Sequence, residues 1–154
     1  MKIDGQCHCG KIQFSCDAYA PVPYMHCYCS ICRKTAGGGG YSINLGAWTE
    51  SLTVTGEDNL GVYQAVIDGK QSAAQRKFCR ACGTFLWAFD PRWPELIHPF
   101  ASCIDTPLPE PPERVHIMLQ YKAPWAQVPE GEGNRHFDEY PDESLADWHT
   151  RWGF

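Results

Sequence analysis

Seven of the nine cysteines in this 154-residue chain lie in three close-spaced groups that could hold metal ions. The groups are Cys7 and Cys9, then Cys27, Cys29 and Cys32, and then Cys79 and Cys82. A Cys-x-Cys or Cys-x-x-Cys pair places two sulfurs on one tight turn, where they can share a tetrahedral zinc ion at about 2.3 Å. The cysteine count is odd and low for a small disulfide scaffold, so metal or redox chemistry is the better prediction.

The groups can be combined in two ways. Cys79 and Cys82 can close a zinc site with Cys7 and Cys9, or with two members of the middle group, which would leave Cys7 and Cys9 without partners. We favour the first, because it keeps three thiolates together, and three protein ligands leave one coordination position open. The middle group could instead be a redox thiol set, or a structural site completed by His26 or another side chain.

Five cations lie next to the cysteine groups: Arg33, Lys34, Arg76, Lys77 and Arg80. They could compensate the negative charge of a thiolate-rich centre or recognise an anionic ligand. Arg33, which follows Cys32 directly, is the candidate for binding a substrate carboxylate. The run Gly37–Gly40 lacks the Gly-Lys-Ser/Thr ending of a phosphate loop, so it predicts a flexible segment beside the metal rather than a nucleotide site.

Short β-rich segments separate the cysteine groups and must position them. Residue types and turn signals predict strands within residues 11–16, 41–45, 52–55, 60–67, 74–78, 84–89 and 115–121. One short helix is expected from Ser30 to Lys34, because the glycine run would stop it. Cys16 and Cys103 stand in apolar β contexts and are expected in the core. The fold class predicted is mainly β.

Length and charge limit the class of protein. The chain fits one domain, residues 1–154, and has no apolar run of about 18 residues, which argues against a membrane span. The net charge of −5 comes from an acidic C-terminal tail, residues 129–154, whose Tyr140 and Trp148 suggest that it docks. The sequence has no stripe of basic residues, which argues against nucleic acid as the main ligand. The first residues reach Cys7 without an apolar signal segment, which predicts a cytoplasmic protein.

The sequence around the cysteines resembles the glutathione-dependent formaldehyde-activating enzyme family, also called the centromere protein V domain family. The resemblance covers roughly residues 3–141. It rests on Gly5-Gln6-Cys7-His8-Cys9-Gly10, Cys27-Tyr28-Cys29-Ser30-Ile31-Cys32-Arg33, Phe78-Cys79-Arg80-Ala81-Cys82-Gly83-Thr84, Ser102-Cys103-Ile104-Asp105, His116-Ile117 and Ala123-Pro124-Trp125. Two positions depart from the pattern, because Tyr28 replaces a common histidine and Cys103 a usual threonine.

The resemblance implies a complex β fold of small antiparallel sheets stapled by zinc and related to a zinc-containing exchange-factor-like fold. It implies two zinc ions per chain, a structural one on Cys7, Cys9, Cys79 and Cys82 and a second on Cys27, Cys29 and Cys32. The implied activity is that of a carbon–sulfur lyase, which adds glutathione or a similar thiol to formaldehyde. The alternative is a non-catalytic zinc-binding module for a protein or peptide, since fold does not fix function. A disulfide reductase is disfavoured, because no Cys-x-x-Cys lies in a βαβ pattern.

Overall fold

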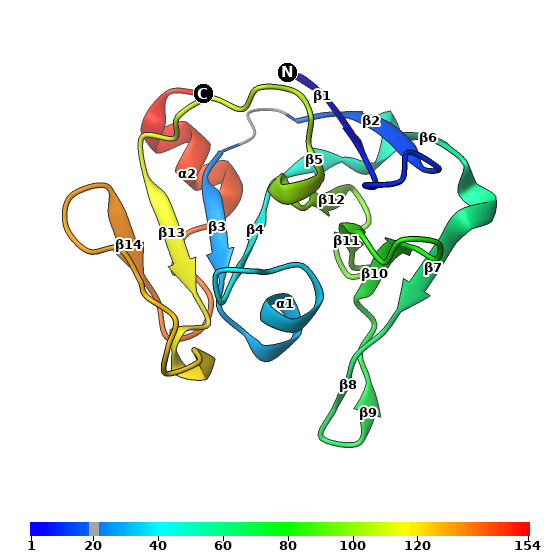
Figure 1. Ribbon diagram of the computed structural model, residues 1–154. Helices are drawn as coiled ribbons and strands as arrows, with labels where there is room; N and C mark the ends of the chain where they lie inside the picture. Colours follow the sequence, from blue (N-terminus) through cyan, green and yellow to red (C-terminus); the bar gives the residue numbers. More distant parts are fainter. Residues whose placement is uncertain (19–21) are drawn as a thin grey trace.

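The computed structural model describes residues 1–18 and 22–154, which form a mainly β fold of small sheets with few helices (Figure 1). A three-stranded antiparallel sheet holds the N-terminus, in the order β1-β2-β6. Its strands are β1 (Lys2–Gln6), β2 (Gln13–Asp17) and β6 (Thr53–Thr55). Gly5 of β1 is required by close packing, since a Cβ there would lie 2.6 Å from the Cys103 carbonyl oxygen.

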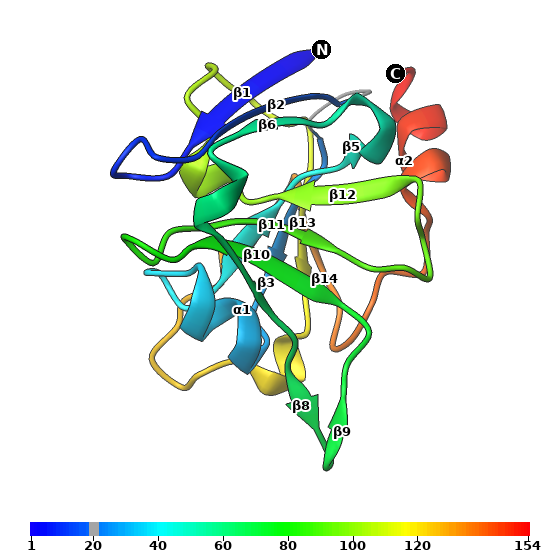
Figure 2. The same ribbon diagram turned by 90° about the vertical axis from the view of Figure 1, so that its right-hand side faces the viewer.

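A five-stranded antiparallel sheet follows the order β5-β12-β11-β10-β7. Its strands are β5 (Ala47–Trp48), β7 (Leu60–Tyr63), β10 (Gln75–Cys79), β11 (Phe85–Phe89) and β12 (Leu96–Pro99). Between β7 and β10, a two-stranded hairpin of β8 (Val66–Ile67) and β9 (Lys70–Gln71) projects from the body, as Figure 2 shows. This sheet carries one predicted cysteine pair at the end of β10.

A four-stranded sheet, β14-β13-β3-β4, carries the middle cysteines. Its strands are β3 (Tyr24–Cys27), β4 (Ser42–Asn44), β13 (Arg114–Ile117) and β14 (Asn134–His136). β13 runs parallel to both β3 and β14, whereas β3 and β4 are antiparallel, so this sheet is mixed. In Figure 1 it lies on the left, the five-stranded sheet lies on the right, and α1 (Ser30–Thr35) lies between them.

The remaining elements are short helices. The 3-10 turns are η1 (Thr49–Ser51), η2 (Glu57–Asn59), η3 (Ala101–Cys103) and η4 (Leu119–Tyr121). The C-terminal helix α2 (Leu145–Trp152) buries Trp148, whose indole N–H donates to Glu113 at 2.9 Å. This confirms the expectation that the acidic tail docks. Within the described ranges, no helix has the length and apolar character needed to cross a membrane.

Most sequence-based expectations for the elements are confirmed. Each of the seven predicted β segments overlaps a strand, and the expected helix is α1. The segment 115–121 is only half correct, because β13 ends at Ile117 and the chain then turns into η4. Cys16 and Cys103 lie in the core with Ile3, Phe14 and Leu86, as predicted.

Candidate metal centres and functional site

The structure brings Cys7, Cys9, Cys79 and Cys82 together into what we call the four-cysteine cluster. Their sulfur atoms all lie within 4.8 Å of one another. The Cys9 sulfur is 3.5 Å from that of Cys7 and 3.8 Å from that of Cys79. A tetrahedral ion with Zn–S bonds of about 2.3 Å would separate its sulfurs by about 3.8 Å. The donor set therefore fits a closed metal site, in the combination that the sequence favoured.

Two similar turns present these four sulfurs. In the first turn, the Cys7 N–H donates to Ile12 and the turn closes at Gly10, whose φ is +71°. In the second turn, the Cys79 N–H donates to Thr84 and the turn closes at Gly83, whose φ is +77°. Positive φ favours glycine at both positions. Each turn thus supplies one buried cysteine, Cys7 or Cys79, and one exposed cysteine, Cys9 or Cys82, to the cluster.

Hydrogen bonds across the turns favour a thiolate at Cys82, whereas contacts with the other thiols raise the pKa of Cys9 to about 11. Thr84 is central, because its hydroxyl accepts the N–H of His8 at 3.2 Å and lies 3.2 Å from the Cys82 sulfur. The side-chain and backbone contacts with Thr84 lower the pKa of Cys82 to about 5. A metal ligand must be deprotonated, so a low pKa at this position favours metal binding at neutral pH.

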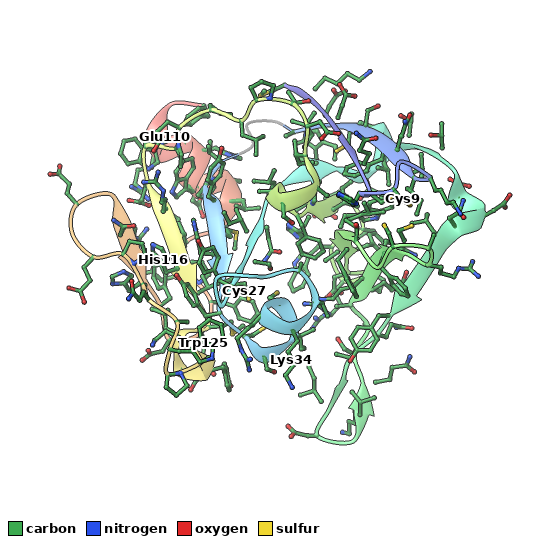
Figure 3. The ribbon with its side chains drawn as sticks, in the orientation of Figure 1. Cys9, Cys27, Lys34, Glu110, His116 and Trp125 are labelled. Atoms are coloured by element: carbon green, nitrogen blue, oxygen red, sulfur yellow. The ribbon has the colours of Figure 1, made fainter. Side chains whose placement is uncertain are left out.

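Cys27, Cys29 and Cys32 form a second group, the three-cysteine cluster, whose sulfurs also lie within 4.8 Å of one another. Cys27 ends β3, Cys29 caps the N-terminus of α1, and Cys32 lies in its first turn. The Cys29 sulfur accepts the Cys32 N–H at 3.3 Å. Figure 3 shows Cys27 next to α1 and Cys9 on the opposite side, near β1 and β2, so the clusters are separate. Three sulfurs leave one tetrahedral position for another ligand.

His26 does not complete the three-cysteine cluster. Successive side chains along a strand point to opposite faces, and His26 points away from its neighbour Cys27. Its ring packs against Tyr41 at 4.9 Å and His116 at 4.8 Å between centroids, and its Nδ1 lies 3.0 Å from the Tyr24 carbonyl oxygen. Burial lowers the pKa of His26 to about 4. His26 therefore has a structural role in the four-stranded sheet.

Arg76 of β10 is the cation that reaches the three-cysteine cluster. Its Nη2 lies 3.5 Å from the Cys32 sulfur. Contacts with Cys27 and Cys29 lower the pKa of Cys32, and the charge of Arg76 lowers it further, although burial opposes both. The same contacts between the thiols raise the pKa of Cys27.

The other predicted cations lie differently. Arg33 follows Cys32 on α1, and its Nε is buried without a hydrogen-bond partner among the described residues. Lys34 is exposed at the outer side of the helix (Figure 3). Lys77 donates to Gln75 at 2.9 Å and Arg80 to the Leu60 carbonyl at 2.7 Å. Of the five, Arg76 is the one with a contact to a cluster sulfur.

Tyr140 of the tail also comes near the three-cysteine cluster. In the four-stranded sheet Cys27 pairs with Ile117. The residue after Ile117, Met118, donates its N–H to the Glu139 carbonyl oxygen at 2.9 Å, which brings the neighbour of Tyr140 to this end of the sheet. The Tyr140 side chain itself is 70% exposed. Sequence reasoning did not place Tyr140 here, because Tyr140 is 113 residues beyond Cys27 and the tail has no motif of its own.

The comparisons with known proteins agree with this geometry. Residues 2–120 match the family described as glutathione-dependent formaldehyde-activating enzyme. The chain belongs to this family. A protein of Halomonas elongata, provisionally named a glutathione-dependent formaldehyde-activating enzyme, is 54% identical over 153 residues, covering 99% of this chain and 98% of that protein. A crystal structure of a Rhodobacter sphaeroides protein has a TM-score of 0.55 and 27% identity, covering 69% of this chain and 91% of that one.

The two departures from the family pattern lie in the core of this formaldehyde-activating family member. Tyr28 is fully buried, and its hydroxyl lies 3.3 Å from His116 Nδ1 and donates to the Gln127 carbonyl at 3.4 Å. The Tyr28 side chain therefore packs away from the sulfurs on either side of it. Cys103 donates to the Leu86 carbonyl at 3.2 Å, and burial raises its pKa to about 12. Both positions serve packing.

The glycine run lies between α1 and β4, a few residues after Cys32. Gly40 is buried with a φ of +94°, and a Cβ there would lie 2.5 Å from the Cβ of Ala126 and 3.2 Å from the ring of Trp125. At this position glycine is required by close packing as well as by backbone conformation.

Proposed function

We propose that this protein is a zinc-dependent carbon–sulfur lyase that adds glutathione, or a similar thiol, to formaldehyde or a similar small carbonyl at the three-cysteine cluster. The observation that carries the proposal is the convergence of three sulfurs, one fewer than a closed site needs, in a member of this family. The four-cysteine cluster would hold a structural zinc and the three-cysteine cluster a second, open one, giving two ions per chain.

The reaction needs no oxidant or reductant. A bond forms between the thiol sulfur and the carbonyl carbon, the C=O π bond breaks, and the proton lost by the thiol ends on the oxygen, giving S-(hydroxymethyl)glutathione. When bound, zinc would lower the pKa of a thiol and polarise a carbonyl. Arg33 would orient the substrate by pairing with a carboxylate of the peptide, which its unpartnered buried Nε supports.

We extend the proposal to the domain that holds both clusters, the location of the protein and its partner. We place both centres in a single domain that spans residues 1–154, in a cytoplasmic protein whose fold is related to zinc-containing exchange-factor-like β folds. The partner would be a small anionic thiol rather than nucleic acid or a membrane. The net charge of −5 supports the first exclusion, because a phosphate backbone is bound by clustered cations.

The test compares rates, because formaldehyde and glutathione also combine without a catalyst. Exchange NMR on the hemithioacetal equilibrium would measure the protein-dependent rate for the wild type and for Cys29→Ser. A metal-bound thiol stays deprotonated where the free thiol is protonated. The advantage over the uncatalysed rate should therefore grow as the pH falls from about 8 to about 6, and Cys29→Ser should abolish it. If the exchange rate is the same with and without the protein across that range, the lyase proposal is refuted and the non-catalytic binding module is favoured.

A further inference from the structure

We propose that Arg76 is a positioning residue for the three-cysteine cluster: its guanidinium holds the Cys32 sulfur as a hydrogen-bonded thiolate and compensates the charge that accumulates when an anionic ligand takes the open position. This inference rests on the proposed function, because it concerns the metal-loaded three-cysteine cluster. It adds an outer-sphere residue that comes from a different sheet from the ligands.

The placement of Arg76 supports this role. Arg76 lies on β10, whereas the three cysteines come from β3 and the start of α1, and Cys32 is 44 residues earlier in the chain. The 3.5 Å contact between its Nη2 and the Cys32 sulfur therefore joins the five-stranded sheet to the cluster. Among residues 1–18 and 22–154, Arg76 forms no ion pair with a carboxylate, and its Nε is buried without a hydrogen-bond partner. Its charge is directed at the sulfur instead.

The three sulfurs have unequal surroundings. Cys32 accepts from Arg76, and Cys29 accepts the backbone N–H of Cys32 at 3.3 Å. In the described part of the chain, Cys27 has no hydrogen-bond donor from outside the cluster. A hydrogen bond from a cation to a thiolate lowers the electron donation of that sulfur to a metal. Cys27 is thus the strongest donor of the three and Cys32 the weakest.

Charge counting gives the consequence for the ligand. Three thiolates and a divalent ion sum to −1, and an anionic thiol at the fourth position makes the sum −2. Cys27 and Cys32 are both buried, and a buried charge without compensation is costly. Arg76 returns the sum to −1. The residue therefore favours an anionic ligand over the free site without touching the ligand itself.

Cobalt loading of the full chain tests this without any measurement of activity. The variants are Arg76→Gln, Arg76→Lys and the control Lys77→Gln, which removes the same charge from the next residue, bonded to Gln75. The difference spectrum between wild type and Cys29→Ser assigns the bands of the three-cysteine cluster. In Arg76→Gln the thiolate-to-cobalt band should shift to lower energy, because Cys32 then donates more strongly to the metal. Chelator competition should still show about 10- to 100-fold weaker binding at this cluster, because the loaded cluster keeps a buried charge of −1 that nothing compensates. The four-cysteine cluster and Lys77→Gln should keep wild-type values.

Each outcome decides the proposal. If Arg76→Gln matches the control in band position and affinity, Arg76 is not a positioning residue, while the lyase proposal stands. If the wild type binds metal only at the four-cysteine cluster, the open centre and this inference both fail. If Arg76→Gln does not fold by circular dichroism, Arg76→Lys decides instead. That variant keeps the charge but loses the planar donor, so an unshifted band in it would overturn the inference.

Discussion

The two clusters should differ sharply in their contribution to folding. Cys79 is fully buried in the main core, and it closes a site between two turns that are 70 residues apart in the chain. Cys29 is half-buried and belongs to the cluster with an open position. Changing each to serine removes one sulfur ligand with little change in volume. We expect Cys79→Ser to unfold or aggregate, and Cys29→Ser to stay folded with one metal fewer.

The magnitudes follow from the two sites. A closed structural zinc contributes on the order of 10 kcal/mol or more of apparent folding free energy. A domain is stable by about 5–15 kcal/mol in total, so loss of that site is enough to unfold it. Cys29 also caps α1 by accepting the Cys32 N–H at 3.3 Å. Serine is a preferred N-cap, so Cys29→Ser keeps this contact, and the loss at the helix should be below about 1 kcal/mol.

Metal analysis and thermal unfolding by circular dichroism measure both effects. Cys16→Ala is the control for loss of a thiol as such, because Cys16 is 1% exposed in the core and belongs to neither cluster. This control should fold with two metals. Equal unfolding of Cys29→Ser and Cys79→Ser would refute the division into an open and a structural site. So would a folded Cys79→Ser protein that keeps both metals.

Three further predictions concern the substrate, the tail and pH. Glutathione should raise the melting temperature of the zinc-loaded protein, because any ligand of the native state does. Arg33→Ala should reduce that rise, and the control Lys34→Ala should leave it intact. No rise in the wild type would exclude glutathione as the ligand. Trp148→Ala should lower the free energy of unfolding, measured in urea, by about 3–5 kcal/mol. Trp152→Ala should lower it far less, because Trp152 is 41% exposed. Equal losses would show that docking of α2 does not depend on Trp148. Burial lowers the pKa of His116 from 6.5, so the unfolded state binds more protons below that pH and stability falls on acidification. His116→Gln lacks this loss, and the stability gap to wild type should narrow from about pH 7.5 to about pH 5.5, whereas a widening gap would contradict the buried neutral imidazole.

The cysteine clusters could be predicted from sequence because their ligands are local. Each pair or triplet lies on one turn, and spacing alone brings its sulfurs together. The surroundings could not be found in that way. Arg76 reaches Cys32 from another sheet, and the C-terminal tail reaches the same region where Glu139, next to Tyr140, accepts the Met118 N–H. Only tertiary packing creates these contacts, so the sequence offered Arg33 as the nearest cation and gave no reason to prefer Arg76.

Some elements of the fold likewise have no signal in the local sequence, whereas others do. β14 (Asn134–His136) has no apolar residue, and its conformation depends on pairing with β13, so periodicity could not find it. The parallel pairs of the four-stranded sheet likewise depend on long connections rather than on local turns. Helix α2 did carry a signal. The Ser144 hydroxyl caps it by accepting the Asp147 N–H at 3.1 Å, and Gly153 ends it with a φ of +76°.

Strand β10 makes the three-cysteine cluster dependent on the four-cysteine cluster. Within five residues it supplies Arg76 to the three-cysteine cluster and Cys79 to the four-cysteine cluster. Closing the four-cysteine cluster fixes the end of β10 and thereby the position of Arg76, three residues away. Nothing comparable runs in the other direction, because the cysteines of the three-cysteine cluster lie on β3 and α1. Loss of the structural metal should therefore remove the open centre too, whereas loss of the open centre leaves the structural metal in place.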